Sequence, residues 1–441
     1  MARIILIAHP VRGRLYPLLA IGQSLKERGH RVTVIEYPEL SGIAEKLGLE
    51  YLSPALPQSW SKFDSPNPSS PFHKIVPKLI KRLQGTALDP QVHSLLEYLR
   101  TFESYYDPWT GRDLDFLQPA LEEANCDLLL VSDTSFAVKT LAEKLNLPML
   151  SISSGIPLLT RRDYPPEFTD WEDTHTKASR LQNRAAHWIK KRIERPTLER
   201  INHRRRNWNM SPHADLSETL SDAGYLSQWP PGFDFPLRAC STPVHYTGPT
   251  LSTAGRERIS FPWSELTGDP VVYVSAGTVS DPQSYFEAIA AGCAELPVQL
   301  VITQGGGDHP ARGSLPGDPL IVPFAPQLEV LKKSTMVITH ASVNTALEAL
   351  ACGLPSICLP QRLDQFGTAI RLKRAGVALV LTQKNQTPQK IKEAVTQMLL
   401  TPGYSHAAKR YTQTRESKTS MQRTIGIVES TIKEKAHFQN G

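Results

Sequence analysis

The sequence predicts an α/β protein built from two Rossmann-like domains that face each other across a cleft. Patterns typical of buried strands alternate with helical patterns, and this alternation begins near the N-terminus and begins again near Pro270. A proline- and glycine-rich stretch, Trp229 to Pro262, separates the two series and has the composition of an interdomain linker. The chain has 441 residues, which is more than one compact core usually holds. We therefore expect ligands to bind in a cleft between two domains.

The first element is the continuous apolar run Ala2 to Ala8, which is typical of a buried parallel strand. Leu15 to Arg28 has apolar residues at helical spacing, and Gly29 ends this helix. Arg31 to Tyr37 predicts a second strand. Together these elements form a strand–helix–strand unit of the doubly wound kind.

A second unit follows further along the chain, with strand Cys126 to Ser132, helix Ala137 to Leu145 and strand Met149 to Ser153. Between the two units lies an insertion, Ser53 to Gly111, that is rich in proline, serine and aromatic residues. Connections of this kind emerge where open α/β sheets bind ligands, so we expect the insertion to serve in recognition. The alternative is that its aromatic side chains fill a small core of its own. They include Trp60, Phe63, Phe72, Tyr105, Tyr106 and Trp109.

The second series predicts another sheet with its helices. In order we expect strand Val271 to Ser275, helix Ser284 to Cys293, strand Val298 to Thr303, strand Leu320 to Val322, and then helix and strand through Leu359. The expected organisation is a first domain over 1–235, a linker over 236–262 and a second domain over 263–405. A C-terminal helical segment, 406–441, is expected to pack back toward the first domain.

The composition is that of an ordinary globular protein, with 40% hydrophobic and 21% charged residues. No apolar run approaches the roughly 18 to 20 residues needed to span a bilayer, and the apolar start lacks the charged flank of a signal peptide. We therefore expect a cytoplasmic protein. The five cysteines are scattered without paired spacing, so we expect reduced, mostly buried thiols rather than disulfides or a metal site.

One short segment concentrates positive charge, although the formal net charge is only +6. It could be the solvated face of a helix, a contact with an anionic membrane surface, or a nucleic-acid site. No nucleic-acid motif accompanies it, so we expect no nucleic-acid partner. The solvated face and a peripheral position at a membrane remain as alternatives. The residues are Lys190, Lys191, Arg192, Arg195, Arg200, Arg204, Arg205 and Arg206.

The most informative segment runs from Val322 to Leu381. Its strand Met336 to Thr339 leads into a helix that carries Glu348. The N-terminus of such a helix presents free amide groups and a positive dipole end, which suit a diphosphate. Donor side chains at the same place are those of His340, Asn344 and Thr345, while a carboxylate one turn further can accept hydrogen bonds from ribose hydroxyls.

This segment closely resembles the nucleotide-sugar signature of inverting glycosyltransferases of the GT-B fold, the family of plant and macrolide glycosyltransferases. The family pattern runs Pro-Gln, a spacer, Thr-His-x-Gly-x-Asn-Ser/Thr, Glu, Gly-x-Pro and finally Asp-Gln. The matching residues are Pro326-Gln327, Thr339-His340, Asn344-Thr345, Glu348, Gly353-Leu354-Pro355 and Asp364-Gln365. The resemblance covers nearly the whole chain. Gln228 to Pro249 is similar to the carotenoid-glucosyltransferase (zeaxanthin glucosyltransferase) branch of the family.

The resemblance implies a role for each matching residue. Phe324 and Gln327 would flank the nucleobase, and Glu348 would bind ribose. The diphosphate would be held by His340, Asn344, Thr345 and Thr278, where Thr278 ends a family-like strand, Val272 to Thr278. Asp364 and Gln365 would bind the sugar hydroxyls. Two departures stand here, since Ala341-Ser342 replaces the usual glycine-rich pair and Thr368 stands where Asn is common.

The catalytic position also departs from the family. A His in a Gly-His-x-x-Pro context would remove the acceptor proton, but the matching stretch is Gly13-Arg14-Leu15-Tyr16-Pro17. Arginine stays protonated at neutral pH and cannot act as a general base. The carboxylate that orients the family's His is matched by Asp133. Three possibilities stay open: Asp133 is the base, His9 is the base, or transfer is lost and binding remains.

The resemblance therefore implies an inverting hexosyltransferase that uses a UDP- or TDP-sugar, with glucose as the first expectation. The implied acceptor is a hydroxyl of a hydrophobic small molecule or a lipid-like compound. The nucleotide sugar is a co-substrate, and no metal or other cofactor is implied because the leaving diphosphate is stabilised by a helix N-terminus and side chains. A silent homologue that binds nucleotide sugar is the main alternative, and a GT-B epimerase of nucleotide sugars is a further one.

Overall fold

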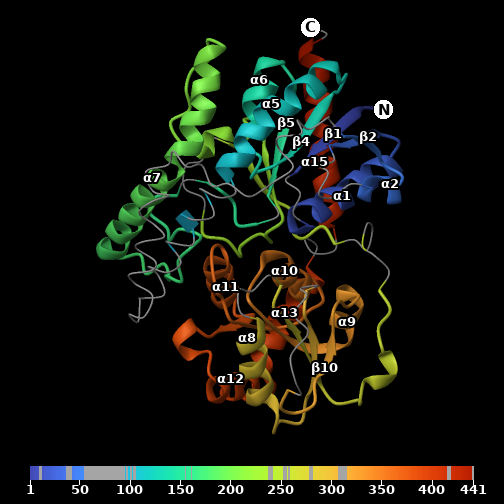
Figure 1. Cartoon of the computed structure of the whole chain (residues 1–441), viewed down its shortest axis with the longest axis vertical. Coiled ribbons are helices and arrows are strands. Elements are labelled where there is room, and N and C mark those ends of the chain that lie inside the picture. The colour runs from blue at the N-terminus through green and yellow to red at the C-terminus, as the bar shows by residue number, and fades with distance from the viewer. Residues whose placement is uncertain are drawn as a thin grey trace.

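The computed structural model contains two parallel β-sheets that lie one beyond the other along the long axis of the molecule (Figure 1). Helices cover both faces of each sheet, so the predicted pair of Rossmann-like α/β domains is confirmed. The structure describes residues 1–8, 12–35, 42–53, 95, 98–99, 102, 106–153, 155–159, 161–236, 242–251, 256, 259–277, 282–305, 315–414 and 419–439.

The first sheet has seven strands in the order β3-β2-β1-β4-β5-β6-β7. Neighbouring strands are parallel throughout. The strands are β1 (Arg3–Ile7), β2 (Arg31–Ile35), β3 (Glu50–Leu52), β4 (Leu128–Ser132), β5 (Met149–Ser153), β6 (Tyr225–Ser227) and β7 (Val244–Tyr246). The helices of this half are α1 (Arg12–Glu27), α2 (Ile43–Lys46), α5 (Asp107–Glu123), α6 (Val138–Lys144), α7 (Lys177–Asn207) and the 3-10 turn η4 (Leu216–Thr219).

The second sheet has six strands in the order β10-β9-β8-β11-β12-β13, again parallel. They are β8 (Val271–Ser275), β9 (Gln299–Thr303), β10 (Leu320–Val322), β11 (Ser334–Thr339), β12 (Ser356–Cys358) and β13 (Ala378–Val380). The helices are α8 (Pro282–Cys293), α9 (Gln327–Lys333), α10 (Val343–Ala351), α11 (Gln365–Arg374), α12 (Pro388–Leu400), α13 (Pro402–Gln413) and α15 (Ser420–Gln439), with 3-10 turns η5 (Trp263–Glu265) and η6 (Gln383–Asn385).

Strand β1 divides the core of the first domain because successive side chains of a strand point to opposite faces. Ile4 and Leu6 pack on the face covered by α1, and Ile5 and Ile7 pack on the face covered by α5 and α6. The C-terminal helix α15 returns to this domain and lies beside α1 (Figure 1). Its residues Ile425 and Val428 join the core of the first face. The last helix of the chain therefore ties the two halves together.

Strand β7 falls inside the proline-rich stretch expected as a linker over 236–262. It pairs with β6 through Tyr225 to Val244 and the two following residue pairs. The first sheet therefore continues to Tyr246. The prolines do not interrupt the strand, because Pro243 precedes β7 and Pro249 follows it.

A buried ionic cluster centred on Asp234, which follows β6 in the sequence, joins the two domains. Asp234 accepts hydrogen bonds from Arg161 of the first domain (Nη2, 2.5 Å), from Arg371 of α11 (Nε, 2.7 Å) and from the Tyr246 hydroxyl (2.7 Å). The side chains of Asp234 and Arg371 are only 3% and 4% exposed. Burial acts to raise the pKa of Asp234, but Arg371 and Arg161 outweigh it and hold this pKa below its ordinary value. This cluster fixes the position of α11 relative to the first domain.

The predicted basic segment lies on α7, but it is not one continuous basic surface. Lys190 and Arg205 face the domain, where they are buried and paired with Glu194 (2.9 Å) and Glu143 (2.6 Å). This correction follows from the helical period, which turns every third or fourth side chain toward the same face. Carboxylates also pair with several of the others: Arg195 and Arg206 with Glu199, and Arg204 with Asp115.

Other sequence expectations concern the insertion and the thiols. Trp60, Phe63, Phe72, Tyr105 and the side chain of Trp109 lie outside the described residues, whereas Tyr106 packs against Phe102 and Phe136. Cys126, Cys293, Cys352 and Cys358 are free thiols, and Cys240 lies outside the described residues.

None of the helices in the described ranges combines the length and apolar character that crossing a membrane requires.

Candidate functional site

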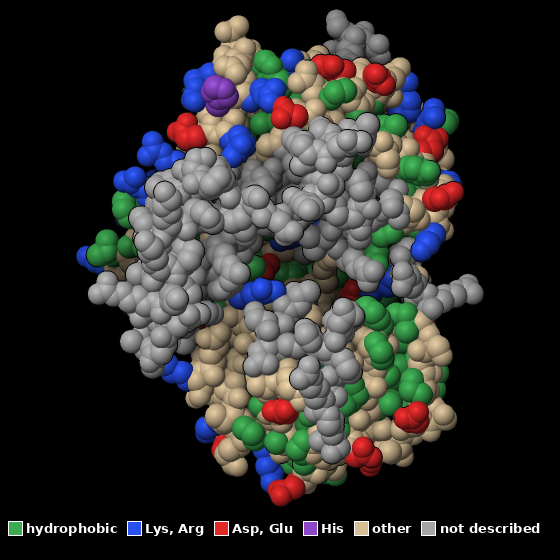
Figure 2. All heavy atoms as spheres, in the orientation of Figure 1, with side chains coloured by type: hydrophobic (Ala, Val, Ile, Leu, Met, Phe, Trp, Pro, Cys, Tyr) green, Lys and Arg blue, Asp and Glu red, His purple; other side chains and the backbone are tan. Residues whose placement is uncertain are grey.

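The site lies where the N-terminus of α1 meets the N-terminus of α10. Asn344 of α10 donates a hydrogen bond from Nδ2 to the carbonyl oxygen of Gly13 (2.8 Å). A Cβ at Gly13 would lie 2.7 Å from this nitrogen, so glycine permits the close approach of the two domains. Figure 2 shows a hollow on one face of the molecule at the level between the two domains, with charged side chains visible inside it.

Asp133 follows β4 and is fully buried, with a side chain that is 0% exposed. Its Oδ2 accepts a hydrogen bond from the Tyr225 hydroxyl (2.7 Å), while its Oδ1 accepts none among the described residues. Burial raises the pKa of Asp133, and Arg14 and the Tyr225 hydrogen bond only partly oppose this. The result is a fixed carboxylate with one oxygen that can still accept a hydrogen bond and more basic character than an exposed aspartate.

Arg14 of α1 lies beside this carboxylate, with Nη1 at 3.8 Å from Asp133 Oδ1. Burial acts to lower the pKa of Arg14, but Tyr106, Asp133 and Asp364 outweigh it and raise the pKa above its ordinary value. The guanidinium is therefore permanently charged and excluded as a base. It also needs space, since a Cβ at Gly155 would lie 2.6 Å from Arg14 Nη1.

His340 directly follows the last residue of β11 and is 4% exposed. Its Nδ1 lies 3.2 Å from the carbonyl oxygen of Ser275 and must carry the proton of that hydrogen bond, since a carbonyl only accepts. Burial lowers the pKa of His340 to about 4, so the ring is neutral at pH 7. Gly277 has a φ of 53° and passes so close that its Cβ would lie 2.6 Å from His340 Cε1. Glycine is required at position 277 because a Cβ would be strained at this φ and would also overlap the His340 ring.

The first turn of α10 explains how Ala341-Ser342 replaces the family's glycine-rich pair. Ser342 has a φ of −61° and ψ of 138°, which any residue adopts, and it stands at the N-cap of α10. Its hydroxyl donates to Thr345 Oγ1 (3.1 Å). Ala341 instead has a φ of 66°, a left-handed conformation that costs about 1 kcal/mol or more for a residue with a Cβ. The replacement is accommodated, with strain at Ala341.

Glu348 is the centre of a hydrogen-bond network on the rim of the second sheet. Its side chain is 7% exposed, and its Oε2 accepts from Gln327 Nε2 (2.7 Å). Gln327 Oε1 accepts in turn from the Tyr273 hydroxyl (3.0 Å). Arg256, from the segment between the domains, contacts both oxygens of Glu348. Phe324 follows β10 and precedes Gln327 by three residues. Its side chain is 41% exposed, as expected of an aromatic ring available for stacking.

Asp364 and Gln365 begin α11. Burial raises the pKa of Asp364, and Arg14 of the other domain opposes this rise. Gln365 folds back, and its Oε1 accepts from the backbone nitrogens of Gln361 (2.9 Å) and Arg362 (3.0 Å). Leu363 has a φ of 53°, which is strained for a branched side chain. The structure thus brings Asp364 toward Arg14 and uses Gln365 to hold the preceding turn.

Thr368, which stands where the family often has Asn, is 0% exposed, and its Oγ1 has no hydrogen-bond partner among the described residues. Two other predicted site residues, His9 and Thr278, lie outside the described residues. Within the described ranges, no group of three or more His, Cys, Asp or Glu side chains is arranged to hold a metal ion.

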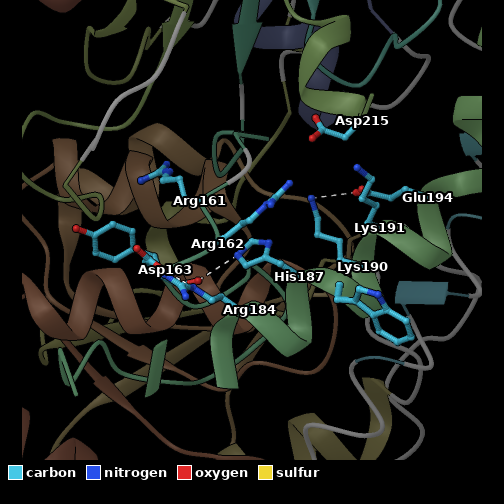
Figure 3. A pocket seen from close by; sticks show the side chains of 11 residues that line it. Arg161, Arg162, Asp163, Arg184, His187, Lys190, Lys191, Glu194 and Asp215 are labelled. Carbon is cyan, nitrogen blue, oxygen red and sulfur yellow. Dashed lines mark hydrogen bonds and ion pairs between the residues drawn. The ribbon is translucent and has the colours of Figure 1, made fainter. Parts of the chain in front are cut away.

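A cavity of about 870 Å³ lies in the first domain between α7 and the segment before it. Figure 3 shows Arg162 and Lys190 extending toward each other, with the Lys190–Glu194 ion pair drawn beside them. Most of the residues that line it are Arg, Lys, Asp or Glu, whereas a pocket for a hydrophobic acceptor is usually lined by hydrophobic and aromatic residues.

Two residues of the site, Tyr225 and Arg256, were not predicted from the sequence, whereas Tyr106 was expected only as an aromatic residue of the insertion. Tyr225 is the first residue of β6, and Arg256 lies in the interdomain stretch. Neither belongs to a motif. A buried aspartate after β4 needs a donor, and that requirement was the one signal that could have prompted a search for a tyrosine on the neighbouring strands.

The chain is similar in sequence to known glycosyltransferases. Residues 287–430 match the family model described as the C-terminal domain of erythromycin biosynthesis protein CIII-like proteins. The chain is 26% identical over 392 residues to a zeaxanthin glucosyltransferase of Pantoea ananas, and the match covers 86% of this chain and 84% of that protein.

Two solved structures share the fold. A glycosyltransferase of kitacinnamycin matches with a TM-score of 0.69 at 21% identity and covers 98% of both chains. The spinosyn rhamnosyltransferase SpnG, complexed with thymidine diphosphate, matches with a TM-score of 0.62 at 18% identity and covers 97% of this chain and 100% of its own. These two structures support the fold, and the family model and the zeaxanthin glucosyltransferase confirm the resemblance that the sequence motifs predicted.

Proposed function

We propose that this chain, which is a glycosyltransferase with the GT-B fold and a relative of zeaxanthin glucosyltransferases, transfers a hexose from a UDP- or TDP-sugar with inversion. The proposed sugar is glucose, and the proposed acceptor is a hydroxyl of a hydrophobic small molecule or lipid-like compound. The 26% identity with a zeaxanthin glucosyltransferase supports both choices. The thymidine diphosphate complex of a structural neighbour supports a nucleotide diphosphate donor.

The observation that carries the proposal is the unfilled hydrogen-bonding capacity of Asp133 Oδ1. This oxygen is buried, accepts no hydrogen bond among the described residues, and lies at the meeting point of the two domains beside Arg14. A hydroxyl donor brought by an acceptor would satisfy it. Of the three possibilities left by the sequence, Asp133 as general base is therefore the one we propose. It also favours an active enzyme over a silent homologue.

The proposed reaction is a single displacement. The acceptor oxygen attacks the anomeric carbon while the bond from that carbon to the diphosphate oxygen breaks, and the hydroxyl proton passes to Asp133 Oδ1. Attack from the side opposite the leaving group inverts the anomeric centre. Arg14 acts as a positioning residue, because its charge offsets those of Asp133 and Asp364 where they approach. The N-terminus of α10 and His340 would stabilise the departing diphosphate without a metal ion.

Protonation of His340 links nucleotide binding to pH. In the protein alone the pKa of His340 is about 4, so the ring is neutral at pH 7 and its proton is committed to Ser275. A nearby diphosphate favours the charged ring and raises this pKa. Binding therefore takes up a proton between the two pKa values, and the affinity for UDP or TDP is expected to rise as pH falls through the raised pKa of the complex toward the pKa of about 4 of the protein alone.

Titration calorimetry in two buffers of different ionisation enthalpy measures this proton uptake directly. His340→Gln should remove the uptake and weaken binding by about 1.5 to 3 kcal/mol, the contribution of a charged hydrogen bond. His406→Gln, on an exposed face of α13, is the matched control and should behave as wild type. Equal affinity and equal proton uptake in wild type and His340→Gln would remove His340 from the phosphate site.

A further inference from the structure

We infer that Arg256 and the ribose of the nucleotide compete for the carboxylate of Glu348, so that the segment joining the two domains limits donor affinity. The inference rests on the proposed nucleotide site and adds a residue that no motif of that site contains. It concerns an arginine placed between β7, which ends at Tyr246, and η5, which begins at Trp263.

The contact is made by two nitrogens on two oxygens. Arg256 Nη1 donates to Glu348 Oε2 at 3.3 Å, and Nη2 donates to Oε1. Such a fork has the strength and the direction of a charge-assisted bidentate pair. The Glu348 side chain is 7% exposed and that of Arg256 is 27% exposed, so solvent screens the pair only in part.

The remaining hydrogen-bonding capacity of Glu348 is already limited. Gln327 Nε2 donates to Oε2 at 2.7 Å, and Gln327 is held in turn by Tyr273. Two neighbouring ribose hydroxyls would need one oxygen each, with the same bidentate geometry that the guanidinium uses. Because both partners approach the carboxylate through the same two oxygens, ribose and Arg256 cannot bind Glu348 in that geometry together.

Competition at Glu348 has a quantitative consequence for donor binding. By linkage, anything that holds Arg256 on Glu348 weakens nucleotide binding by the same factor by which nucleotide weakens the contact. If the contact is made in about nine molecules of ten, it lowers the apparent affinity about tenfold.

The experiment compares wild type, Arg256→Ala and Arg256→Lys by calorimetry with UDP, TDP and inorganic pyrophosphate. Arg256→Ala should bind the better of the two nucleotides about tenfold more tightly, and Arg256→Lys should lie between because lysine makes no fork. Pyrophosphate, which lacks ribose, should bind all three proteins equally. Arg3→Ala breaks a partly exposed ion pair with Asp127 in the first domain and should leave every affinity unchanged.

The other possible results contradict either the competition or the nucleotide site itself. Weaker binding of both nucleotide and pyrophosphate by Arg256→Ala would make Arg256 a phosphate ligand and overturn the competition. Equal nucleotide affinity in wild type and both variants would also overturn it. If neither nucleotide binds any of the proteins, the proposed nucleotide site itself fails, whereas nucleotide binding without an effect of Arg256 leaves that site intact and contradicts only this inference.

Discussion

Replacement of Asp133 by asparagine is expected to reduce glycosyl transfer by about 10² to 10⁴, the usual contribution of a general base. Asparagine keeps the shape of the side chain and an oxygen that can accept from the Tyr225 hydroxyl. It cannot take up the acceptor proton. Nucleotide affinity should stay at the wild-type level, because Asp133 belongs to the first sheet and the predicted donor residues belong to the second.

The pH profile gives an independent readout of the same group. The carboxylate is the active form, and burial raises its pKa, so kcat/KM should fall as pH decreases through a pKa above the ordinary aspartate value of about 3.9. Asp127→Asn is the matched control, because Asp127 precedes the same strand at its opposite end and bonds the backbone of Arg3. Retention of more than about a tenth of the activity by Asp133→Asn would show that another group removes the proton.

Replacement of Asp234 by asparagine is expected to destabilise the folded chain by about 3 to 5 kcal/mol, as removal of one partner from a buried ion pair usually does. The change would leave Arg161 and Arg371 without their shared carboxylate at the contact between the domains. It should also lower activity, because Arg371 lies on α11, which begins directly after Asp364. Denaturation by urea measures the loss of stability.

The sign of the pH dependence follows from the depressed pKa of Asp234. The stabilisation by its charge is present above the unfolded-state pKa of about 3.9 and is lost as pH falls toward the lower pKa of the folded state. Wild type and Asp234→Asn should therefore converge in strongly acid solution. Glu393→Gln, which breaks an exposed pair with Lys390, should leave stability close to that of the wild type. A similar small loss for Asp234→Asn would contradict the account of the interdomain cluster.

The central strands of both sheets could be predicted because they are buried on both faces and form unbroken apolar runs. Strands β3, β6, β7 and β13 were not predicted, because each has only three residues and none was recognised as a separate apolar run, unlike Leu320 to Val322 of β10, which was predicted at the same length. Strand β7 was also hidden in a proline-rich stretch. The order of the strands placed Asp133 and Arg14 together, as expected for residues that follow neighbouring strands.

The donor residues were found through a motif whose spacing survives in the sequence. The motif could not reveal that the pKa of His340 is lowered, because this shift depends on the burial of the ring and on its hydrogen bond to the Ser275 carbonyl. It could not reveal that Asn344 bonds Gly13, 331 positions away. Tyr225 and Arg256 were missed for the same reason, since each acts on a site residue about 92 positions away in the sequence and belongs to no local pattern.

Transfer of the sugar itself is the most direct test of the account. Wild-type protein should be incubated with UDP-glucose or TDP-glucose and a panel of hydrophobic alcohols, with Asp133→Asn in parallel, and the products identified by mass spectrometry. We predict a glycosylated alcohol with inverted anomeric configuration and release of the nucleotide diphosphate, both nearly absent for Asp133→Asn. Nucleotide binding by the wild type without transfer or donor hydrolysis across the whole panel would contradict the account and favour a silent homologue.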